Sequence, residues 1–102
     1  MCGILGSIGQ FKNINNDSFH KALLKSNFRG PDYSDSHNFI SCNNQIFLGH
    51  NRLSIIDLNP TGNQPKESRS KNNMIIFNGE IYNHLELREK FPSDFSWTSN
   101  SD

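Results

Sequence analysis

The sequence predicts one domain of the α+β class, and three observations lead to this class. Short apolar runs alternate with polar turns along the chain, which is typical of strands. Two further segments repeat their apolar residues at helical spacing. The 102 residues leave room for one domain and contain neither an internal repeat nor a linker. Strands with helices at intervals therefore predict a mixed domain.

The first elements expected are a strand and a helix. The apolar run at 2–8 predicts the strand. Residues 17–26 predict the helix, with Asn16 or Asp17 as the N-cap, because both side chains can accept hydrogen bonds from a first helical turn. The residues predicted on its apolar face are Phe19, Ala22 and Leu23.

A hairpin is expected next. Residues 29–32, with the sequence RGPD, have the composition of a turn. Segments 39–42 and 45–51 predict two strands that are joined at Asn43-Asn44. Cys42 lies inside this hairpin and is expected to be a packing residue.

The later elements follow a polar connection. Residues 59–73 carry no apolar side chain, so they predict either a functional or a flexible loop. Residues 74–77 predict a buried strand. Helical periodicity resumes at 84–91, with Asn83 as N-cap and Glu86 completing a capping box.

Two predictions concern the remaining apolar residues. Residues 53–58 form a further apolar stretch, and residues 94–97 predict the start of a short strand. Trp97 and the eight phenylalanines are candidates for the core.

Composition excludes several classes of partner. Ten basic and ten acidic residues give a net charge of zero, so the chain lacks the footprint of a nucleic-acid or membrane-surface protein. The four histidines and two cysteines show no metal-ligand spacing, so no metal site is expected. The chain has no signal peptide and no apolar run of about 18 residues. A cytoplasmic protein with reduced thiols is therefore expected.

Cys2 directly follows the initiator methionine, and its small side chain permits removal of Met1. Removal would place a thiol and a free α-amine on one residue. A free cysteine titrates near about 8.5 and an α-amine near about 7.7 to 8.0, so the amine can accept the thiol proton at neutral pH. This pair predicts a nucleophile with its own base, and the alternative is an ordinary structural cysteine.

Six short motifs occur in a fixed order. They are Met1-Cys2-Gly3-Ile4, RGPD at Arg29–Asp32, GHNRLSIIDL at Gly49–Leu58, GNQP at Gly62–Pro65, FNGEIYNHLELR at Phe77–Arg88 and the closing Ser101-Asp102. This series resembles the glutamine amidotransferase domain of the glutamine-hydrolysing asparagine synthetases, which are N-terminal-nucleophile hydrolases. The segment LSIID after Arg52 favours this branch over relatives that aminate sugar phosphates.

The resemblance implies a fold and a domain organisation. The fold would be a four-layer αββα sandwich, of which this chain supplies only part, so unpaired edges and an unfilled core are expected. A hydrophobic content of 33% and a mean hydropathy of −0.67 agree with an incomplete core. Residues 1–102 would be the N-terminal part of a type-2 glutamine amidotransferase domain. The ATP-dependent synthetase domain, which would use ATP and Mg, would be absent.

The resemblance also implies three catalytic groups. Cys2 would attack the side-chain amide of glutamine, forming a thioester and releasing ammonia. Asn78, through its side-chain amide, and Gly79, through its backbone N–H, would form the oxyanion hole. The alternative for Asn78-Gly79 is a simple hairpin turn.

Three further residues would bind the substrate by the same resemblance. Arg52 would bind the α-carboxylate of glutamine with its planar fork, and Asp102 would pair with the α-ammonium. Glu80 would help to hold the amino-acid end. A lone arginine on a strand is more often solvated, but the opposite charges of Arg52 and Asp102 suit a zwitterionic ligand.

The partners implied are glutamine for this chain, with aspartate and ATP for the full-length enzyme, which would be a homodimer. Two alternatives stay open. The acceptor could be a peptide or a surface-polysaccharide precursor instead of aspartate. The chain could also be an inert truncated fragment, and the isolated fragment is expected to be weakly active or inactive.

Overall fold

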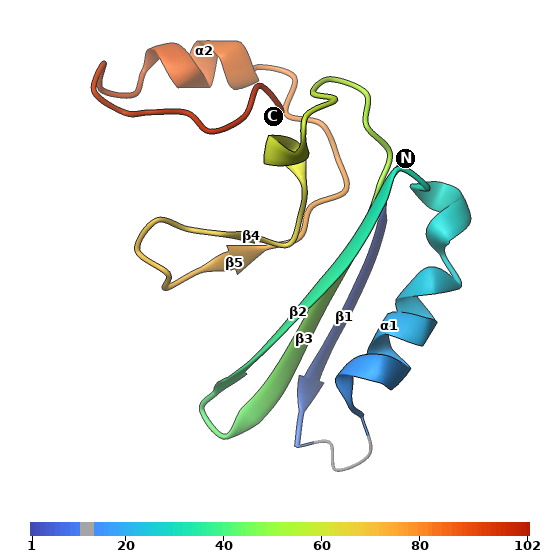
Figure 1. The fold of residues 1–102 in the computed structure, drawn as a ribbon. Coiled ribbons are helices and arrows are strands. Elements are labelled where there is room, and N and C mark those ends of the chain that lie inside the picture. The colour runs from blue at the N-terminus through green and yellow to red at the C-terminus, as the bar shows by residue number, and fades with distance from the viewer. Residues whose placement is uncertain (11–13) are drawn as a thin grey trace.

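The computed structural model describes residues 1–10 and 14–102. Its main sheet has three antiparallel strands in the order β1-β3-β2. These strands are β1 (Gly3–Gly9), β2 (Tyr33–Ser41) and β3 (Asn44–Arg52). Helix α1 (Asn16–Leu24) runs along one face of the sheet (Figure 1). The predicted mixture of helices and strands is therefore confirmed.

The second half of the chain forms shorter elements. They are the 3-10 turn η2 (Pro60–Gly62), the strand pair β4 (Lys66–Glu67) and β5 (Met74–Ile75), and helix α2 (His84–Glu89). Figure 1 shows these elements on the side of the sheet away from α1. No helix in the described residues is long and apolar enough to cross a bilayer.

The core lies between α1 and the sheet. Phe19 and Leu23 of α1 are buried, and the Phe19 ring stacks on Phe47 of β3 with 5.1 Å between ring centroids. Gly49 lies beneath the helix, where a Cβ would come within 2.9 Å of a Leu23 methyl. Ala22 is exposed, so the prediction that it joins the buried face was wrong.

The N-cap of α1 is Asn15, one residue before the predicted caps. The Asn15 side chain accepts a hydrogen bond from the Ser18 N–H at 2.9 Å, and the Ser18 hydroxyl accepts one from the Asn15 N–H at 3.1 Å. This reciprocal pair satisfies donors that the first helical turn leaves free. The 3-10 turn η1 (Asn27–Arg29) follows and leads into the predicted turn at 29–32.

The hairpin is present, but its turn lies one residue earlier than predicted. Cys42 and Asn43 have φ values of 49° and 63°, which is the pattern of a two-residue primed turn. Cys42 is therefore exposed and does not pack in the core. Strand β2 begins at Tyr33, well before the predicted residue 39.

Three expectations for the later segments were wrong. Residues 74–77 form a strand over only Met74–Ile75, and Ile75 is 56% exposed, so this segment is not a buried strand. Asn83 does precede α2, but its side chain makes no capping bond because its backbone is not extended. The segment 94–97, which was predicted to begin a short strand, contains none.

Aromatic residues of the C-terminal segment cluster at the surface instead of in the core. Trp97 is 44% exposed and lies 4.7 Å from Phe95 and 5.2 Å from Phe91 between ring centroids. The Arg88 guanidinium lies 4.6 Å from the centre of the Trp97 ring. Of the eight phenylalanines, Phe19 and Phe47 are buried, and Phe11 lies outside the described residues.

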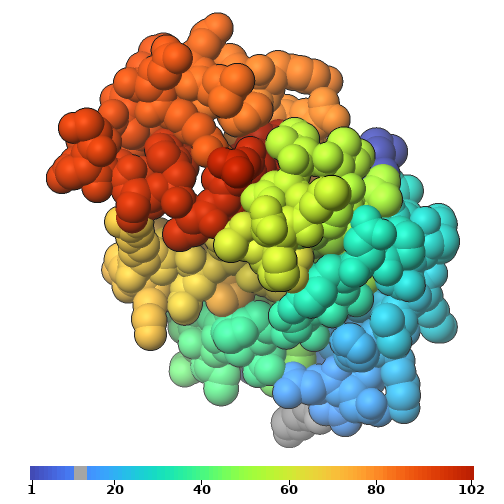
Figure 2. All heavy atoms as spheres, turned by 45° about the horizontal axis from the view of Figure 1, so that its top comes forward, coloured from blue at the N-terminus to red at the C-terminus, as the bar shows by residue number. Residues whose placement is uncertain are grey.

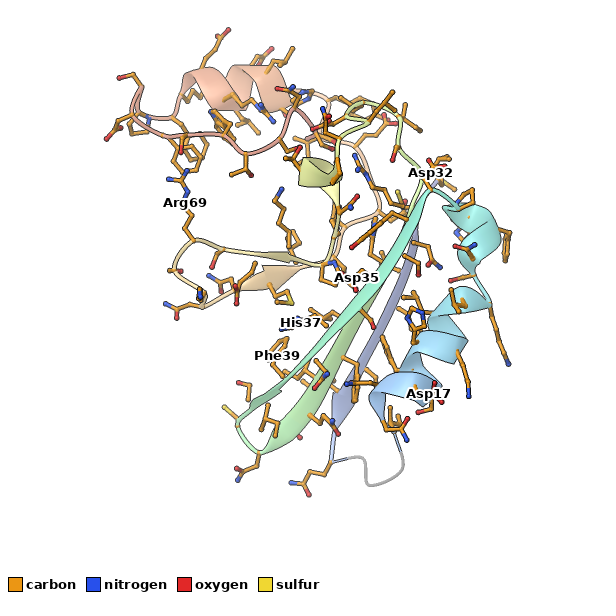
Figure 3. The ribbon with its side chains drawn as sticks, viewed as in Figure 1. Asp17, Asp32, Asp35, His37, Phe39 and Arg69 are labelled. Carbon is orange, nitrogen blue, oxygen red and sulfur yellow. The ribbon has the colours of Figure 1, made fainter. Side chains whose placement is uncertain are left out.

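The second face of the sheet is apolar and exposed. Figure 3 shows His37 and Phe39 projecting from β2 on the side opposite α1. On this face, the register pairs Phe39 with Ile46 and Ile46 with Ile8. Ile8 is 65% exposed and Ile4, on the same face, is 50% exposed. The sheet therefore presents apolar side chains on both faces.

We expect Gly30→Ala to destabilise the fold by about 3 kcal/mol, because overpacking against backbone cannot be relieved by a rotamer change. A Cβ at Gly30 would lie 2.6 Å from the backbone carbon of Arg52. Urea denaturation measures the loss. Gly6→Ala is the matched control, since a Cβ there would meet its nearest atom at 3.9 Å. Equal stability of the two variants would contradict this packing.

Candidate active site

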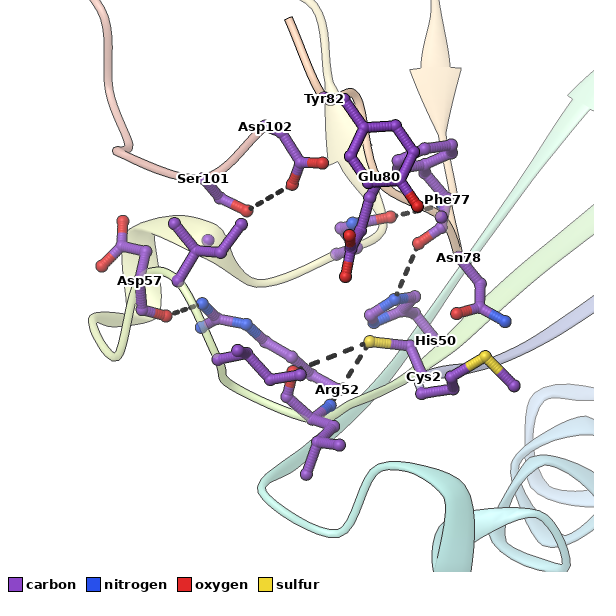
Figure 4. Close-up of a pocket in the computed structure, with 17 residues that line it drawn as sticks. Cys2, His50, Arg52, Asp57, Phe77, Asn78, Glu80, Tyr82, Ser101 and Asp102 are labelled. Carbon is purple, nitrogen blue, oxygen red and sulfur yellow. Dashed lines mark hydrogen bonds between the residues drawn. The ribbon is translucent and has the colours of Figure 1, made fainter. Parts of the chain in front are cut away.

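A cavity of about 330 Å³ lies beyond the ends of β1 and β3, between the sheet and the C-terminal segment (Figure 4). Figure 2 shows the C-terminal residues, in dark red, lying against the yellow-green segment that follows β3. All of the predicted site residues line this cavity: Cys2, Arg52, Asn78, Gly79, Glu80 and Asp102. Residues far apart in the sequence are thus brought together.

Cys2 is half-buried at the start of β1. The Leu53 N–H points at its sulfur at 3.4 Å, and the thiol lies 3.8 Å from the Leu53 carbonyl. The Arg29 guanidinium donates to the Cys2 carbonyl at 3.2 Å. The two contacts with Leu53, the residue directly after β3, hold the sulfur at the cavity wall (Figure 4).

Arg52 is 5% exposed, and three oxygen atoms accept hydrogen bonds from its guanidinium. Nη1 donates to the Asn59 carbonyl at 2.7 Å and to Asn63 Oδ1 at 2.8 Å, and Nη2 donates to the Asp57 carbonyl. Gly62 leaves space for the group, because a Cβ there would come within 2.8 Å of Cζ. Among the described residues, Arg52 has no carboxylate partner. Two of its five N–H groups stay free for a ligand.

Asn78 and Gly79 follow Phe77, whose backbone N–H and carbonyl both form hydrogen bonds to side chains. The Phe77 N–H donates to Gln64 Oε1 at 2.6 Å, and the Phe77 carbonyl lies 3.2 Å from His50 Nε2. Gly79 packs on the Phe77 ring, where a Cβ would be 2.7 Å from Cζ. Asn78 and Gly79 are exposed toward the cavity opening. Figure 4 shows Asn78 on the same side of the cavity as Cys2.

His50 is 1% exposed, and burial together with the nearby Arg52 charge lowers its pKa. A neutral ring with the proton on Nε2 accounts for the bond to the Phe77 carbonyl. The buried Nδ1 atom has no partner among the described residues. His50 therefore fixes the position of Phe77 without carrying a charge.

We expect the His50 ring to titrate below its ordinary pKa of about 6.5. Because the folded pKa is lowered, neutral His50 stabilises the fold above about pH 6.5, and this contribution is lost as the pH falls further. NMR of ¹³C-labelled histidine rings measures the pKa, and His50→Gln identifies the signal. A pKa at or above 6.5 would contradict the burial described.

Asp102 is held at the opposite wall of the cavity. Its Oδ2 atom accepts a hydrogen bond from the Ile81 N–H at 2.6 Å, and the Ser101 hydroxyl contacts Oδ1 at 3.4 Å. The Arg88 guanidinium donates to the carbonyls of Ser99 and Ser101 at 2.8 and 2.7 Å. Helix α2 and the residues before it thus anchor the segment that carries this carboxylate.

Asp57 is 4% exposed and accepts hydrogen bonds from two parts of the chain. Oδ1 accepts from the backbone and side-chain N–H groups of Asn59, and Oδ2 accepts from the Ser99 hydroxyl and the Asn100 N–H, all within 3.0 Å. The backbone donors of Asn59 and Asn100 hold the pKa of the Asp57 carboxyl well below its usual range. The ionised form therefore stabilises the fold at neutral pH, and this stabilisation is lost as the pH falls below about 3.9.

Sequence reasoning did not assign roles to His50, Asp57 or Gln64. A signal was available for Asp57, because an acidic residue between Ile56 and Leu58 in an apolar stretch suggests a buried charge. No comparable signal marks Gln64. Within the described residues, no group of three or more His, Cys, Asp and Glu side chains is placed to hold a metal ion.

Comparison with known proteins identifies the class of this domain. The family model for the glutamine amidotransferase domain matches residues 1–102, and the chain belongs to this family.

Its relatives include glutamine-hydrolysing asparagine synthetases. The chain is 41% identical to asparagine synthetase 2 of Arabidopsis thaliana over 96 residues, covering 91% of this chain and 16% of the relative. It is 36% identical to asparagine synthetase B of Escherichia coli over 105 residues, covering the whole chain and 18% of that protein. Amidase chry2 of Gibberella zeae is 39% identical over 74 residues, or 72% of this chain and 11% of the relative. The chain spans a fifth or less of the length of these relatives, and no solved structure gives a significant match.

Proposed function

We propose that the domain to which this chain belongs hydrolyses the side-chain amide of glutamine, with Cys2 as the nucleophile. The observation that carries the proposal is the state of Arg52. A buried guanidinium needs an anion, and here it has no carboxylate partner among the described residues and borders a cavity. Cys2 and Asp102 line the same cavity, so a ligand with a carboxylate, an ammonium and a reactive amide fits its chemistry.

The proposed reaction has two steps. The Cys2 sulfur attacks the amide carbon, a thioester forms, and the amide nitrogen leaves as ammonia after taking up the thiol proton. Water then hydrolyses the thioester, which gives glutamate and restores the thiol. The free α-amine of Cys2 would carry the proton, so Met1 must be removed first. Met1 is 76% exposed, which leaves its peptide bond open to a peptidase.

Asn78 and Gly79 would stabilise the oxyanion that forms during the attack. Both lie at the cavity, and both follow Phe77, which Gln64 and His50 hold in place. A donor pair that is fixed before the reaction stabilises developing charge without reorganisation.

Arg52 and Asp102 would bind the two charges of the amino-acid end. The free N–H groups on Nε and Nη2 of Arg52 can bind the α-carboxylate as a fork. Asp102 would accept the α-ammonium, and Glu80, which is exposed at the cavity, would assist it.

The exposed face of the sheet supports the proposed four-layer fold. Ile4 and Ile8 are half or more exposed on the face opposite α1. A second sheet packed on this face would remove these side chains from water. Residues 1–102 would then be the N-terminal part of the amidotransferase domain.

The ammonia would serve asparagine synthesis in a full-length enzyme. Most relatives described are named as glutamine-hydrolysing asparagine synthetases, and they are five or more times longer than this chain. A synthetase domain would use ATP and Mg to convert aspartate to asparagine. The likeness to an amidase keeps another acceptor as the second candidate.

The test is glutamate release. The protein is produced from its natural start, keeping any coding sequence that continues past Asp102, and mass spectrometry confirms loss of Met1. We expect glutamate and ammonia in equal amounts from L-glutamine. Glutaramate lacks the α-ammonium, so its kcat/KM should be lower than that of glutamine by about tenfold or more. A protein that lacks Met1, contains the whole amidotransferase domain and releases no glutamate would refute the proposal. Residues 1–102 alone are expected to be weakly active or inactive, because they would be an incomplete domain.

A further inference from the structure

We propose that Asp57 is a positioning residue for recognition of the substrate α-ammonium, an inference that rests on the proposed function. Its carboxylate joins the segment that carries Asp102 to the loop that holds Arg52. One residue, through its side chain and its main chain, thus sets the separation of the two groups that would bind opposite charges of one ligand.

The two carboxylate oxygens of Asp57 have different partners. Oδ1 accepts from the Asn59 backbone N–H at 2.9 Å and from Asn59 Nδ2 at 3.0 Å, so it orders its own loop. Oδ2 accepts from the Ser99 hydroxyl and the Asn100 N–H, both at 3.0 Å. The second pair crosses from the loop after β3 to the C-terminal segment, more than forty residues later.

The main chain of Asp57 completes the connection. Its carbonyl accepts a hydrogen bond from Arg52 Nη2 (Figure 4). Asp102 lies two residues after Asn100 and receives the Ile81 N–H on Oδ2. A shift of Asp57 would therefore move Arg52 and Asp102 relative to each other.

The link depends on charge. Asp57 forms no ion pair in the described part of the chain, and neutral donors alone surround its carboxylate. Hydrogen bonds to an ionised acceptor are about twice as strong as neutral ones. Neutralising the carboxylate should weaken the link while the carbonyl still holds Arg52.

The segment has a second anchor, so loss of Asp57 should loosen it without releasing it. Arg88 donates to the carbonyls of Ser99 and Ser101. This arrangement predicts a change in substrate preference with the fold retained.

The test measures kcat/KM for glutamine and for glutaramate, which lacks the α-ammonium. Asp57→Asn and Ser99→Ala should each lower the preference for glutamine about tenfold, mainly through a higher KM for glutamine. If Asp57 had a purely structural role, kcat/KM would fall equally for glutamine and glutaramate, and the preference for glutamine would not change. That result would overturn the proposal.

Thr61→Val is the matched control. The Thr61 hydroxyl also donates to Asp57 Oδ2, at 3.3 Å, but it comes from the loop and not from the C-terminal segment. The glutamine preference should therefore stay within about twofold of the parent protein. A control variant that loses the preference as strongly as Ser99→Ala would contradict the proposed link.

Amide hydrogen exchange provides a readout that is independent of glutaminase activity. In Asp57→Asn the amides of Asn100 and Ile81 should exchange faster, because Ile81 is bonded to Asp102 and not to Asp57. Unchanged exchange at Ile81 would overturn the inference even if glutamine is hydrolysed. Faster exchange in a protein that hydrolyses no glutamine would refute the proposed function alone.

Discussion

Cys2→Ala should abolish glutamate release from glutamine. Among the described residues that line the cavity, Cys2 and Met1 alone carry sulfur, and Met1 is cleaved off in the proposed active form. Loss of a hydrolase nucleophile lowers kcat by about a million-fold, which places the remaining rate below detection. Steady-state release of glutamate and ammonia measures the effect.

Cys42→Ala is the matched control for this experiment. Cys42 is exposed at the tip of the β2–β3 hairpin, away from the cavity lining, so its loss should leave turnover unchanged. Glutamate production that survives Cys2→Ala would refute the assignment of the nucleophile. So would turnover by a preparation in which every molecule retains Met1.

Asn78→Ala should lower kcat by about 10² to 10³, equivalent to about 2.7 to 4 kcal/mol of barrier, because one of the two proposed oxyanion donors is lost. The Gly79 N–H would remain, so activity should fall without vanishing. KM should change little, since the donor acts on charge that develops during the attack. Kinetics with L-glutamine separate the two parameters.

Asn83→Ala is the control for this second experiment. Asn83 lies in the same sequence block, and its side chain forms no capping bond to α2 and does not line the cavity. The kcat of the Asn83→Ala variant should match that of the parent protein. An Asn78 variant that changes KM alone would mean that Asn78 binds substrate instead of stabilising the oxyanion.

Patterns of apolar and polar residues predicted the elements whose structure depends on residues close together in the sequence. The hairpin followed from two apolar runs around polar residues, and α1 followed from the spacing of Phe19 and Leu23. Strand β2 was predicted too short because the α1-facing positions of its first part, residues 33–38, are polar. Ser34 donates to Asn51 Oδ1 at 2.7 Å, and Asn38 donates to Asn16 Oδ1 at 2.6 Å. Side-chain hydrogen bonds there replace the apolar alternation that normally reveals a strand.

The ordered motifs predicted which residues line the cavity. They did not predict the hydrogen bonds that hold those residues in place. Cys2, Arg52 and Asp102 each belong to a different motif, and the structure brings all three to one cavity. The bonds from Asp57 to residues 99 and 100 join segments far apart in sequence, so no local pattern could reveal them. The aromatic cluster around Trp97 was placed in the core because composition cannot show which apolar residues lack a covering layer.

The position of Met1 has a practical consequence for producing the protein. Its side chain is 76% exposed, and it borders the cavity immediately before the half-buried Cys2. An affinity tag fused ahead of Met1 would begin beside the cavity and keep the Cys2 nitrogen in a peptide bond. Preparations for the glutaminase measurements therefore need either a native start codon or a protease site that leaves Cys2 as the first residue.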